Sequence, residues 1–216
     1  MKLSKDTQSY LKNLSTINTN LLIKPGSSLM TISADKAVYA KINVAETFTT
    51  EFGIYDLSEF LGALSLFEDP DLEFSKTHVT IKQGRNSIKY FSANADVLTV
   101  PAKELVLKGG DYKFKLSASD LSLIQRTASV LRANDIIIEG NGEKIVVTVC
   151  DKANSAANSF TQEVGTTTET FKATMKASNL KLMPFDYDAE ICMKKAIKFT
   201  SGDIEYVCVL EADSVF

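Results

Sequence analysis

Few side chains in this 216-residue sequence have the types and the spacing that catalysis or metal binding requires. The single histidine, His78, has no second histidine at a metal-binding spacing, and no Cys-x-x-Cys pair occurs. The Gly-x-Ser-x-Gly signature of serine hydrolases is missing, and Gly109-Gly110 lacks the lysine-hydroxyl pair of a phosphate-binding loop. We therefore predict a non-catalytic protein with no catalytic residue, no metal site and no cofactor.

Two other groups of residues, one acidic and one of cysteines, are better explained by structure than by metal binding or disulfide formation. The acidic run from Glu68 to Glu73 could hold a divalent cation, but it lacks the glycine and terminal glutamate of an EF-hand, which favours a solvated turn. The cysteines are an odd number and lie inside apolar segments, which favours buried free thiols over a disulfide framework. They are Cys150, Cys192 and Cys208.

Cationic and small polar side chains recur at helical spacing and are the candidate ligand-binding residues. On the first expected helix Lys5, Ser9, Lys12 and Thr16 lie opposite the apolar stripe. The expected helix 121–133 places Ser122, Gln125, Arg126, Ser129 and Arg132 on its outer face, and the segment near 178–183 carries Lys181. Long cations separated by hydroxyls suit contact with a phosphate backbone. The candidate DNA-binding residues are Lys5, Lys12, Arg126, Arg132 and Lys181.

The charge distribution supports this hypothesis and leaves one alternative. The chain has 24 basic and 27 acidic residues, a formal net charge of −3, which argues against a protein that coats nucleic acid. Basic helices inside an acidic protein would suit a ring with helices lining the channel, which would slide on DNA without reading bases. The alternative is that these are ordinary solvated helix faces. The second expected helix carries Glu59 and does not share the cationic pattern of the other helices.

The elements that would position these residues repeat along the chain. A polar residue and an Asx open an apolar helical stripe four times, at Lys5-Asp6, Tyr55-Asp56, Ser119-Asp120 and Ser178-Asn179. Short strand-like segments follow each copy. The sequence predicts an α+β fold of two similar domains, each made of two modules in which a helix is followed by antiparallel strands. Such internal duplication is typical of assembly proteins.

The predicted domain limits follow from a break in this pattern near mid-chain. Domain one covers residues 1–92, a connector covers 93–111, and domain two covers 112–216. The connector has neither helical nor strand periodicity, but it is apolar for a linker. It either packs against the protein or forms a hydrophobic partner site. No apolar run approaches the ~20 residues of a membrane span, and the first residues do not resemble a signal peptide.

Three blocks of the sequence resemble the sliding clamps of T4-type bacteriophages. They are MKLSKDT with LKN and TIN in Met1–Asn18, IYDL with FLG and LSL in Ile54–Phe67, and YVCVLEADS in Tyr206–Ser214. The resemblance implies the DNA-clamp fold, in which three copies close head-to-tail into a ring with helices inside. It also implies a non-enzymatic factor that encircles duplex DNA and tethers the replicative DNA polymerase for processive synthesis. A clamp loader would open the ring in the host cytoplasm at the replication fork, and a role in late viral transcription is implied too.

Two further sets of site residues are expected on this basis. A hydrophobic pocket for the polymerase C-terminal peptide would be formed by Val38, Val97, Leu98, Val100 and Leu210, unless these residues only fix the connector in place. A head-to-tail ring needs one exposed strand edge on each side. We assign these edges to 87–92 and 158–164, and the subunit-contact residues are Ser87, Lys89, Phe91, Ser159 and Thr161.

Two other functional classes remain as alternatives. A structural or scaffold phage protein could duplicate β-rich modules for packing alone and have no role on DNA. An enzyme that acts on a small ligand could also use a duplicated fold, although the missing catalytic groups argue against it.

Overall fold

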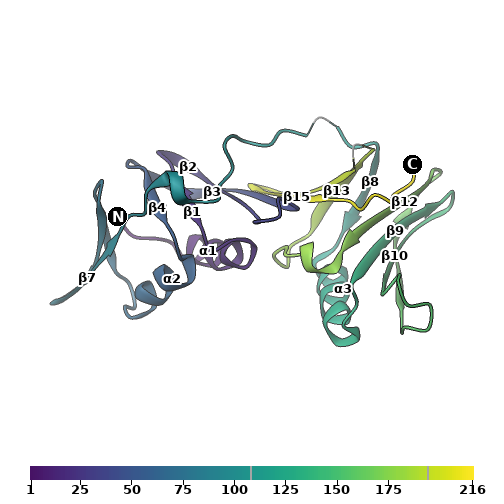
Figure 1. Ribbon diagram of the computed structural model, residues 1–216, viewed down its shortest axis with the longest axis horizontal. Helices are drawn as coiled ribbons and strands as arrows, with labels where there is room; N and C mark the ends of the chain where they lie inside the picture. The colour runs from purple at the N-terminus through teal and green to yellow at the C-terminus, as the bar shows by residue number, and fades with distance from the viewer. Residues whose placement is uncertain (108, 194) are drawn as a thin grey trace. The chain divides into compact units, whose positions relative to one another are not determined.

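The computed structural model describes residues 1–107, 109–193 and 195–216. The chain divides into two compact units, Met1–Leu105 and Val106–Phe216, which we call the first and second domains (Figure 1). The division lies within the predicted connector, of which Lys108 is outside the described residues. None of the described helices is long and apolar enough to cross a membrane.

The first domain packs two α-helices against three small antiparallel sheets (Figure 1). In chain order its elements are α1 (Lys5–Ile17), β1 (Leu21–Ile23), β2 (Gly26–Ile32), β3 (Val38–Phe48), β4 (Phe52–Ile54), α2 (Leu57–Ser65), β5 (Asp71–Phe74), β6 (His78–Gln83), β7 (Asn86–Phe91) and the 3-10 turn η1 (Ala95–Val97). Here β1 pairs with β4, β2 with β3, and β5-β6-β7 form a third sheet with β7 at one edge. The core consists of the apolar stripes of α1 and α2 and the strand residues that face them.

Helix α1 begins where side chains satisfy its free backbone N–H groups. Ser4 is the N-cap, and its hydroxyl accepts a hydrogen bond from the Thr7 N–H. Glu46 on β3 accepts hydrogen bonds from the Ser4 N–H and the Thr7 hydroxyl. Burial acts to raise the pKa of Glu46, but these hydrogen bonds outweigh it, so the pKa is below its ordinary value. This carboxylate therefore fixes the start of α1 against the sheet.

The second domain has one α-helix in its described residues and eight strands (Figure 1). In chain order its elements are β8 (Tyr112–Leu116), α3 (Ala118–Leu131), β9 (Asp135–Asn141), β10 (Lys144–Cys150), β11 (Phe160–Thr166), β12 (Thr170–Lys176), the 3-10 turn η2 (Ala177–Asn179), β13 (Tyr187–Cys192), β14 (Ala196–Ser201) and β15 (Ile204–Val209). One sheet has the order β11-β10-β9-β12, and β8-β13-β14-β15 form the other. Their buried faces and the stripe of α3 form the core.

The two domains repeat one plan, which confirms the duplication expected from the sequence. After its first helix each domain has four strands, a helical segment and three strands. In the second domain the first four pair as β11-β10-β9-β12; the first domain has the equivalent order β3-β2-β1-β4, with β1 beside β2. The place of β8 is taken by Met1, which exchanges two backbone hydrogen bonds with Leu72 of β5.

The predicted short helix near Ser178–Met183 is wrong. The chain makes only the single 3-10 turn η2 there and continues without regular structure to β13. Pro184 cannot continue a helix and disfavours helical backbone at the residue before it. In addition, the Gln125 side-chain amide on α3 donates hydrogen bonds of 3.0 Å to the carbonyls of Leu180 and Leu182. This contact holds the segment against α3 in a non-helical form.

In two helices the N-cap residue differs from the predicted polar–Asx pair. The sequence motif placed N-cap chemistry at Lys5-Asp6 and Ser119-Asp120, but the N-caps are Ser4 and Ser117. In both helices the aspartate instead lies within the first turn, where a negative charge is favourable near the helix N-terminus. Asp56 is the N-cap of α2 as expected, since its carboxylate accepts from the N–H groups of Ser58 and Glu59.

Candidate functional site

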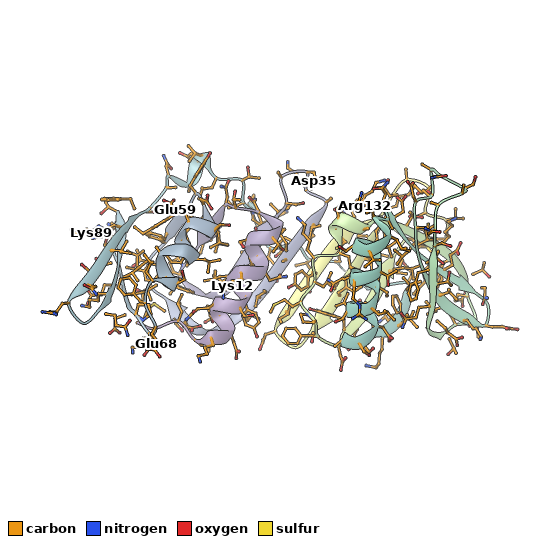
Figure 2. The ribbon with its side chains drawn as sticks, turned by 90° about the horizontal axis from the view of Figure 1, so that it is seen from below. Lys12, Asp35, Glu59, Glu68, Lys89 and Arg132 are labelled. Carbon is orange, nitrogen blue, oxygen red and sulfur yellow. The ribbon has the colours of Figure 1, made fainter. Side chains whose placement is uncertain are left out.

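The outer face of α1 carries the predicted cations and hydroxyls. Thr7, Leu11, Leu14 and Ile17 are buried, and on the opposite side Lys5, Ser9, Lys12 and Thr16 are exposed. Figure 2 shows Lys12 on the helix face that points away from the strands. Among the described residues no acidic side chain forms an ion pair with either lysine. The face therefore presents two uncompensated positive charges.

The outer face of α3 repeats this arrangement with arginines. Ser122, Arg126, Ser129 and Arg132 are exposed, and no described acidic group pairs with either arginine. Arg132 is the C-cap of α3 in the left-handed conformation, with φ of 51° (Figure 2). That backbone geometry ends the helix, so Arg132 lies at the C-terminus of α3.

Two features of α3 differ from the expectation. Gln125, which the sequence placed on the outer face, is half-buried because its amide holds the segment 180–182. Val130 lies on the outer side with 74% of its surface exposed, although no apolar residue was expected among the cations. Val130 falls four residues after Arg126, so helical spacing alone could have placed it on this face.

Lys181 does not belong to a helical cationic face. It follows η2 in the irregular segment held by Gln125, and it is half-buried. The assignment of Lys181 to a helix face opposite a buried stripe is therefore wrong. Residues at this place in the second domain are positioned by tertiary contact with α3, which helical spacing could not reveal.

Helix α2 is the acidic exception in the structure as in the sequence. Glu59 is exposed on its first turn (Figure 2). Nearby, the Tyr90 hydroxyl of β7 donates to the Asp56 carbonyl, and its ring meets that of Phe60 edge-on. Burial raises the pKa of Tyr90 to about 12, and the negative charge of Glu59 adds to the effect. This helix thus has a packing role for β7 and no cationic face.

Most lysines on the described strands are paired with carboxylates, in contrast to the helix cations. Eight strand lysines have an acidic partner within the same domain, in most cases on a neighbouring strand. The pairs are Lys41–Glu104, Lys82–Glu73, Lys113–Glu190, Lys115–Asp188, Lys144–Glu163, Lys172–Glu139, Lys176–Asp135 and Lys198–Glu190. The sheets therefore contribute little net positive charge, and the helix cations remain available to a ligand.

The connector is bound to the first domain along residues 93–104. Ala93 donates its N–H to the Gly53 carbonyl, and the Asn18 amide donates to the carbonyls of both Ile32 and Thr99. Lys41 of β3 pairs with Glu104. The segment that carries Leu98 and Val100 consequently lies beside the β2–β3 hairpin, in which Val38 begins β3.

The apolar residues expected to form a pocket differ in exposure. Val97 on η1 is 61% exposed, Leu98 and Val100 are half-buried, and Val38 is buried. Leu98 packs so close to Gly53 that a Cβ there would lie 3.0 Å from its Cδ1. Leu210 is buried in the second domain. Within the first domain the connector therefore combines a fixed backbone with an exposed valine, which suits either role proposed for it.

The two segments assigned to subunit contact are at sheet edges. Strand β7 is the edge of β5-β6-β7, and β11 is the edge of β11-β10-β9-β12. Ser87, Lys89 and Phe91 are exposed on β7, with Phe91 at 70%, and Thr161 is exposed on β11. Ser159 is exposed directly before β11 begins. Among the described residues, β7 in the first domain and β11 in the second thus each have a strand partner on one side only.

The remaining reactive side chains do not assemble into a site in the described part of the chain. No group of three or more His, Cys, Asp or Glu residues there could hold a metal ion. His78 lies at the start of β6, where its Nδ1 is near the hydroxyls of Ser75 and Thr77. None of the three cysteines forms a disulfide, and burial raises the pKa of Cys208 to about 12.

Comparison with known proteins identifies the family. A family model described as DNA polymerase processivity factor matches residues 4–100. The sliding clamp of Enterobacteria phage T4 is 32% identical over 225 residues, which cover 99% of this chain and 98% of the relative. The chain belongs to the sliding-clamp family. Membership of this family of processivity factors confirms that the protein is not an enzyme, and it does not favour the scaffold alternative.

Solved structures show the same fold at low sequence identity. Proliferating Cellular Nuclear Antigen from Entamoeba histolytica aligns with a TM-score of 0.72 at 13% identity over 97% of each chain. PCNA from A. fulgidus, solved with the C-terminal region of FEN-1, aligns with a TM-score of 0.70 at 10% identity over 99% of each chain. The predicted α+β clamp fold is therefore confirmed.

Proposed function

We propose that three copies of this sliding-clamp chain close head-to-tail around duplex DNA, with the outer faces of α1 and α3 toward the phosphates. The observation that carries the proposal is that Lys5, Lys12, Arg126 and Arg132 form no ion pair among the described residues, whereas eight of the nine described strand lysines do. Phosphates would supply the missing negative charge. Hydroxyls at Ser9 and Ser122 add short-range donors without blocking the approach of the backbone.

The chemistry of these faces explains movement along DNA. Lysine, arginine and serine contacts to phosphates carry no sequence information, so every register of the duplex has a similar energy. Each contact is exposed to water and screened by salt, and is therefore weak and short-lived. Closure of the ring, rather than affinity for DNA, would then keep the protein on its template.

Subunit contact in this proposal uses the free strand edges. A β7 edge on one copy and a β11 edge on the next would satisfy each other's backbone groups, as in β-strand addition. Because the two edges differ, the contact is heterologous and can close into a ring at a fixed rotation. The contact residues would be Ser87, Lys89, Phe91, Ser159 and Thr161.

The connector side of the first domain would bind the C-terminal peptide of the replicative DNA polymerase. Support comes from the exposed Val97 beside the fixed residues Leu98 and Val100. The A. fulgidus PCNA, which has the same fold, was solved with a C-terminal region of FEN-1. Val38 completes the part of the set that lies in the first domain, and Leu210 of the second domain stays a prediction from the resemblance. An apolar anchor in such a pocket would tether the polymerase and leave the DNA-facing helices free.

Three further parts of the proposal follow from kinship with the phage T4 sliding clamp. A clamp loader opens the ring and places it on primed DNA. The protein acts in the host cytoplasm at the replication fork. The loaded ring also assists late viral transcription, for which the same peptide surface would be used.

Assembly and activity can be tested on the intact chain. Light scattering after gel filtration should give three times the 23.7-kDa chain mass. Addition of the protein and its loader should lengthen the products of the cognate polymerase on a circular primed template. A monomer at every concentration, or product lengths that do not change, would contradict the proposed ring.

A further inference from the structure

One strand lysine lacks the neutralisation that the others share. The described strands contain nine lysines, eight with an acidic partner in the same domain and one, Lys89, without an ion pair. Lys89 is exposed at the centre of the edge strand β7 (Figure 2). Its neighbours on β6 and β7 offer no carboxylate. An acid from another molecule could supply the missing charge.

The two faces of β7 fix the direction of Lys89. Ile88 and Tyr90 lie opposite Ile81 and Val79, which are buried, and the Tyr90 ring contacts Phe60 of α2. Lys89 alternates with these residues and therefore projects from the other face of the sheet, away from α2. Ser87 and Phe91 share that outer face with Lys89.

The edge strand β11 carries an acid on its corresponding face. Phe160 and Gln162 lie opposite the buried Val149 and Val147, and the Gln162 amide donates to Asp120 of α3. Glu163 alternates with Gln162 and lies opposite Val146, on the face away from α3. Its side chain is 50% exposed and pairs with Lys144 at 2.7 Å, which leaves part of the carboxylate accessible.

We propose that Lys89 of one copy pairs with Glu163 of the next copy and sets the register of ring closure. The inference rests on the proposed contact between β7 and β11. When these edges join antiparallel with their helices on one side of the sheet, Lys89 and Glu163 lie on the same face. In a register that places Glu163 opposite Lys89, or diagonal to it by two residues, the two side chains are close enough for an ion pair.

The pair would exclude wrong registers. A slip of one residue between the two edges leaves Lys89 on the outer face of its own sheet but turns Glu163 of the neighbour to the opposite side, so the ion pair is lost. In the correct register, Glu163 would bind two lysines, Lys144 in its own chain and Lys89 from the neighbour. The competing role for Lys89 is protection of a free edge, because lysines on edge strands commonly prevent unwanted strand addition.

A charge exchange on the full-length chain separates these roles. Lys89→Glu places a like charge opposite Glu163, and Glu163→Lys does the reverse. Sedimentation velocity over a dilution series should show half-dissociation at a concentration at least about ten-fold higher for each single variant. The double variant should return to within about three-fold of the unchanged protein. Lys76→Glu, at an exposed turn lysine with no ion pair, is the matched control and should assemble normally.

Other outcomes would overturn the inference in distinguishable ways. If single reversals assemble normally, or if the double variant does not recover, Lys89 and Glu163 are not partners. If Lys89→Glu instead forms species larger than a trimer, the lysine protects the edge. Lys89→Pro and Thr161→Pro remove ladder donors and test the edges themselves. Monomers there, together with a failed charge exchange, would refute only the ion pair, whereas intact trimers would refute the proposed edges.

Discussion

The cations of the helices and those of the strands have opposite surroundings in this fold. Strand lysines such as Lys115 and Lys198 meet a carboxylate on the neighbouring strand, because antiparallel register places side chains of one face in pairs. Lys12 and Arg126 are exposed on helix faces and form no ion pair with any described acidic residue. The charges of these side chains are therefore compensated by carboxylates in one layer and uncompensated in the other.

This difference separates structural charge from functional charge. An exposed ion pair contributes only about 0–1 kcal/mol to folding, so the strand pairs mainly cancel charge on the sheet faces. The unpaired helix cations make no ion-pair contribution to folding, and their role is to attract phosphates. A net charge of −3 is compatible with DNA binding once the two layers are considered separately.

Reversal of helix cations should have the largest effect. Lys12→Glu with Arg126→Glu replaces attraction by repulsion at two faces and should reduce loading and processive synthesis at least about ten-fold. The defect should increase with added salt, which weakens the remaining contacts. The matched control Lys113→Glu with Lys172→Glu makes the same change of charge on strands and should load normally. Equal defects in both variants would remove the distinction between the layers.

Loss of an apolar anchor should affect the partner surface alone. Leu98→Ala should weaken binding of the polymerase tail peptide by about 1–3 kcal/mol in calorimetry if Leu98 lines the pocket. Trimer mass and retention on DNA should not change, since no helix cation is involved. Unchanged peptide affinity would show that Leu98 only fixes the connector against Gly53.

The attachment of α1 should respond to pH through Glu46. Glu46→Gln should lower the free energy of unfolding at pH 7 by about 1–3 kcal/mol, because it weakens the charged hydrogen bonds at Ser4 and Thr7. The folded-state pKa of Glu46 is depressed, so its contribution is present above the unfolded pKa and is lost as the pH falls through the folded pKa. Urea unfolding of both proteins at several pH values should show the difference shrinking in acid. A constant difference would mean that the carboxylate charge has no role.

A smaller effect is expected where α3 holds the irregular segment. Gln125→Ala removes two hydrogen bonds and leaves the Leu180 and Leu182 carbonyls without their partner, at a cost of about 1–2 kcal/mol. Hydrogen exchange should increase in residues 178–186 before it increases elsewhere in the second domain. Ser122→Ala, on the exposed side of the same helix, is the control and should leave exchange unchanged.

Local features of the fold could be read from the sequence, whereas long-range ones could not. The stripe of α1 and the exposed positions of Lys5 and Lys12 follow from helical periodicity, and the structure agrees. The segment 178–183 is not an α-helix for two reasons. Pro184 can be seen in the sequence, but the hydrogen bond from Gln125 of α3 to this segment cannot.

The ion-pair states show the same limit more clearly. The sequence alone does not distinguish the ion-pair state of Lys172 from that of Lys12. Only the register of β12 against β9 shows that Lys172 faces Glu139. A single sequence does not specify which residues meet across paired strands. The candidate DNA face could therefore be proposed from the sequence, but its distinction from the other cations required the structure.

Retention on DNA of defined topology tests the central claim most directly. The protein is loaded onto a nicked circular duplex, separated from free protein at elevated salt, and the circle is then cut once. A ring held by closure should stay with the circle and leave after the cut, because its phosphate contacts are too weak to hold it. Equal retention on circular and linear DNA would contradict the account, and so would loss from the intact circle.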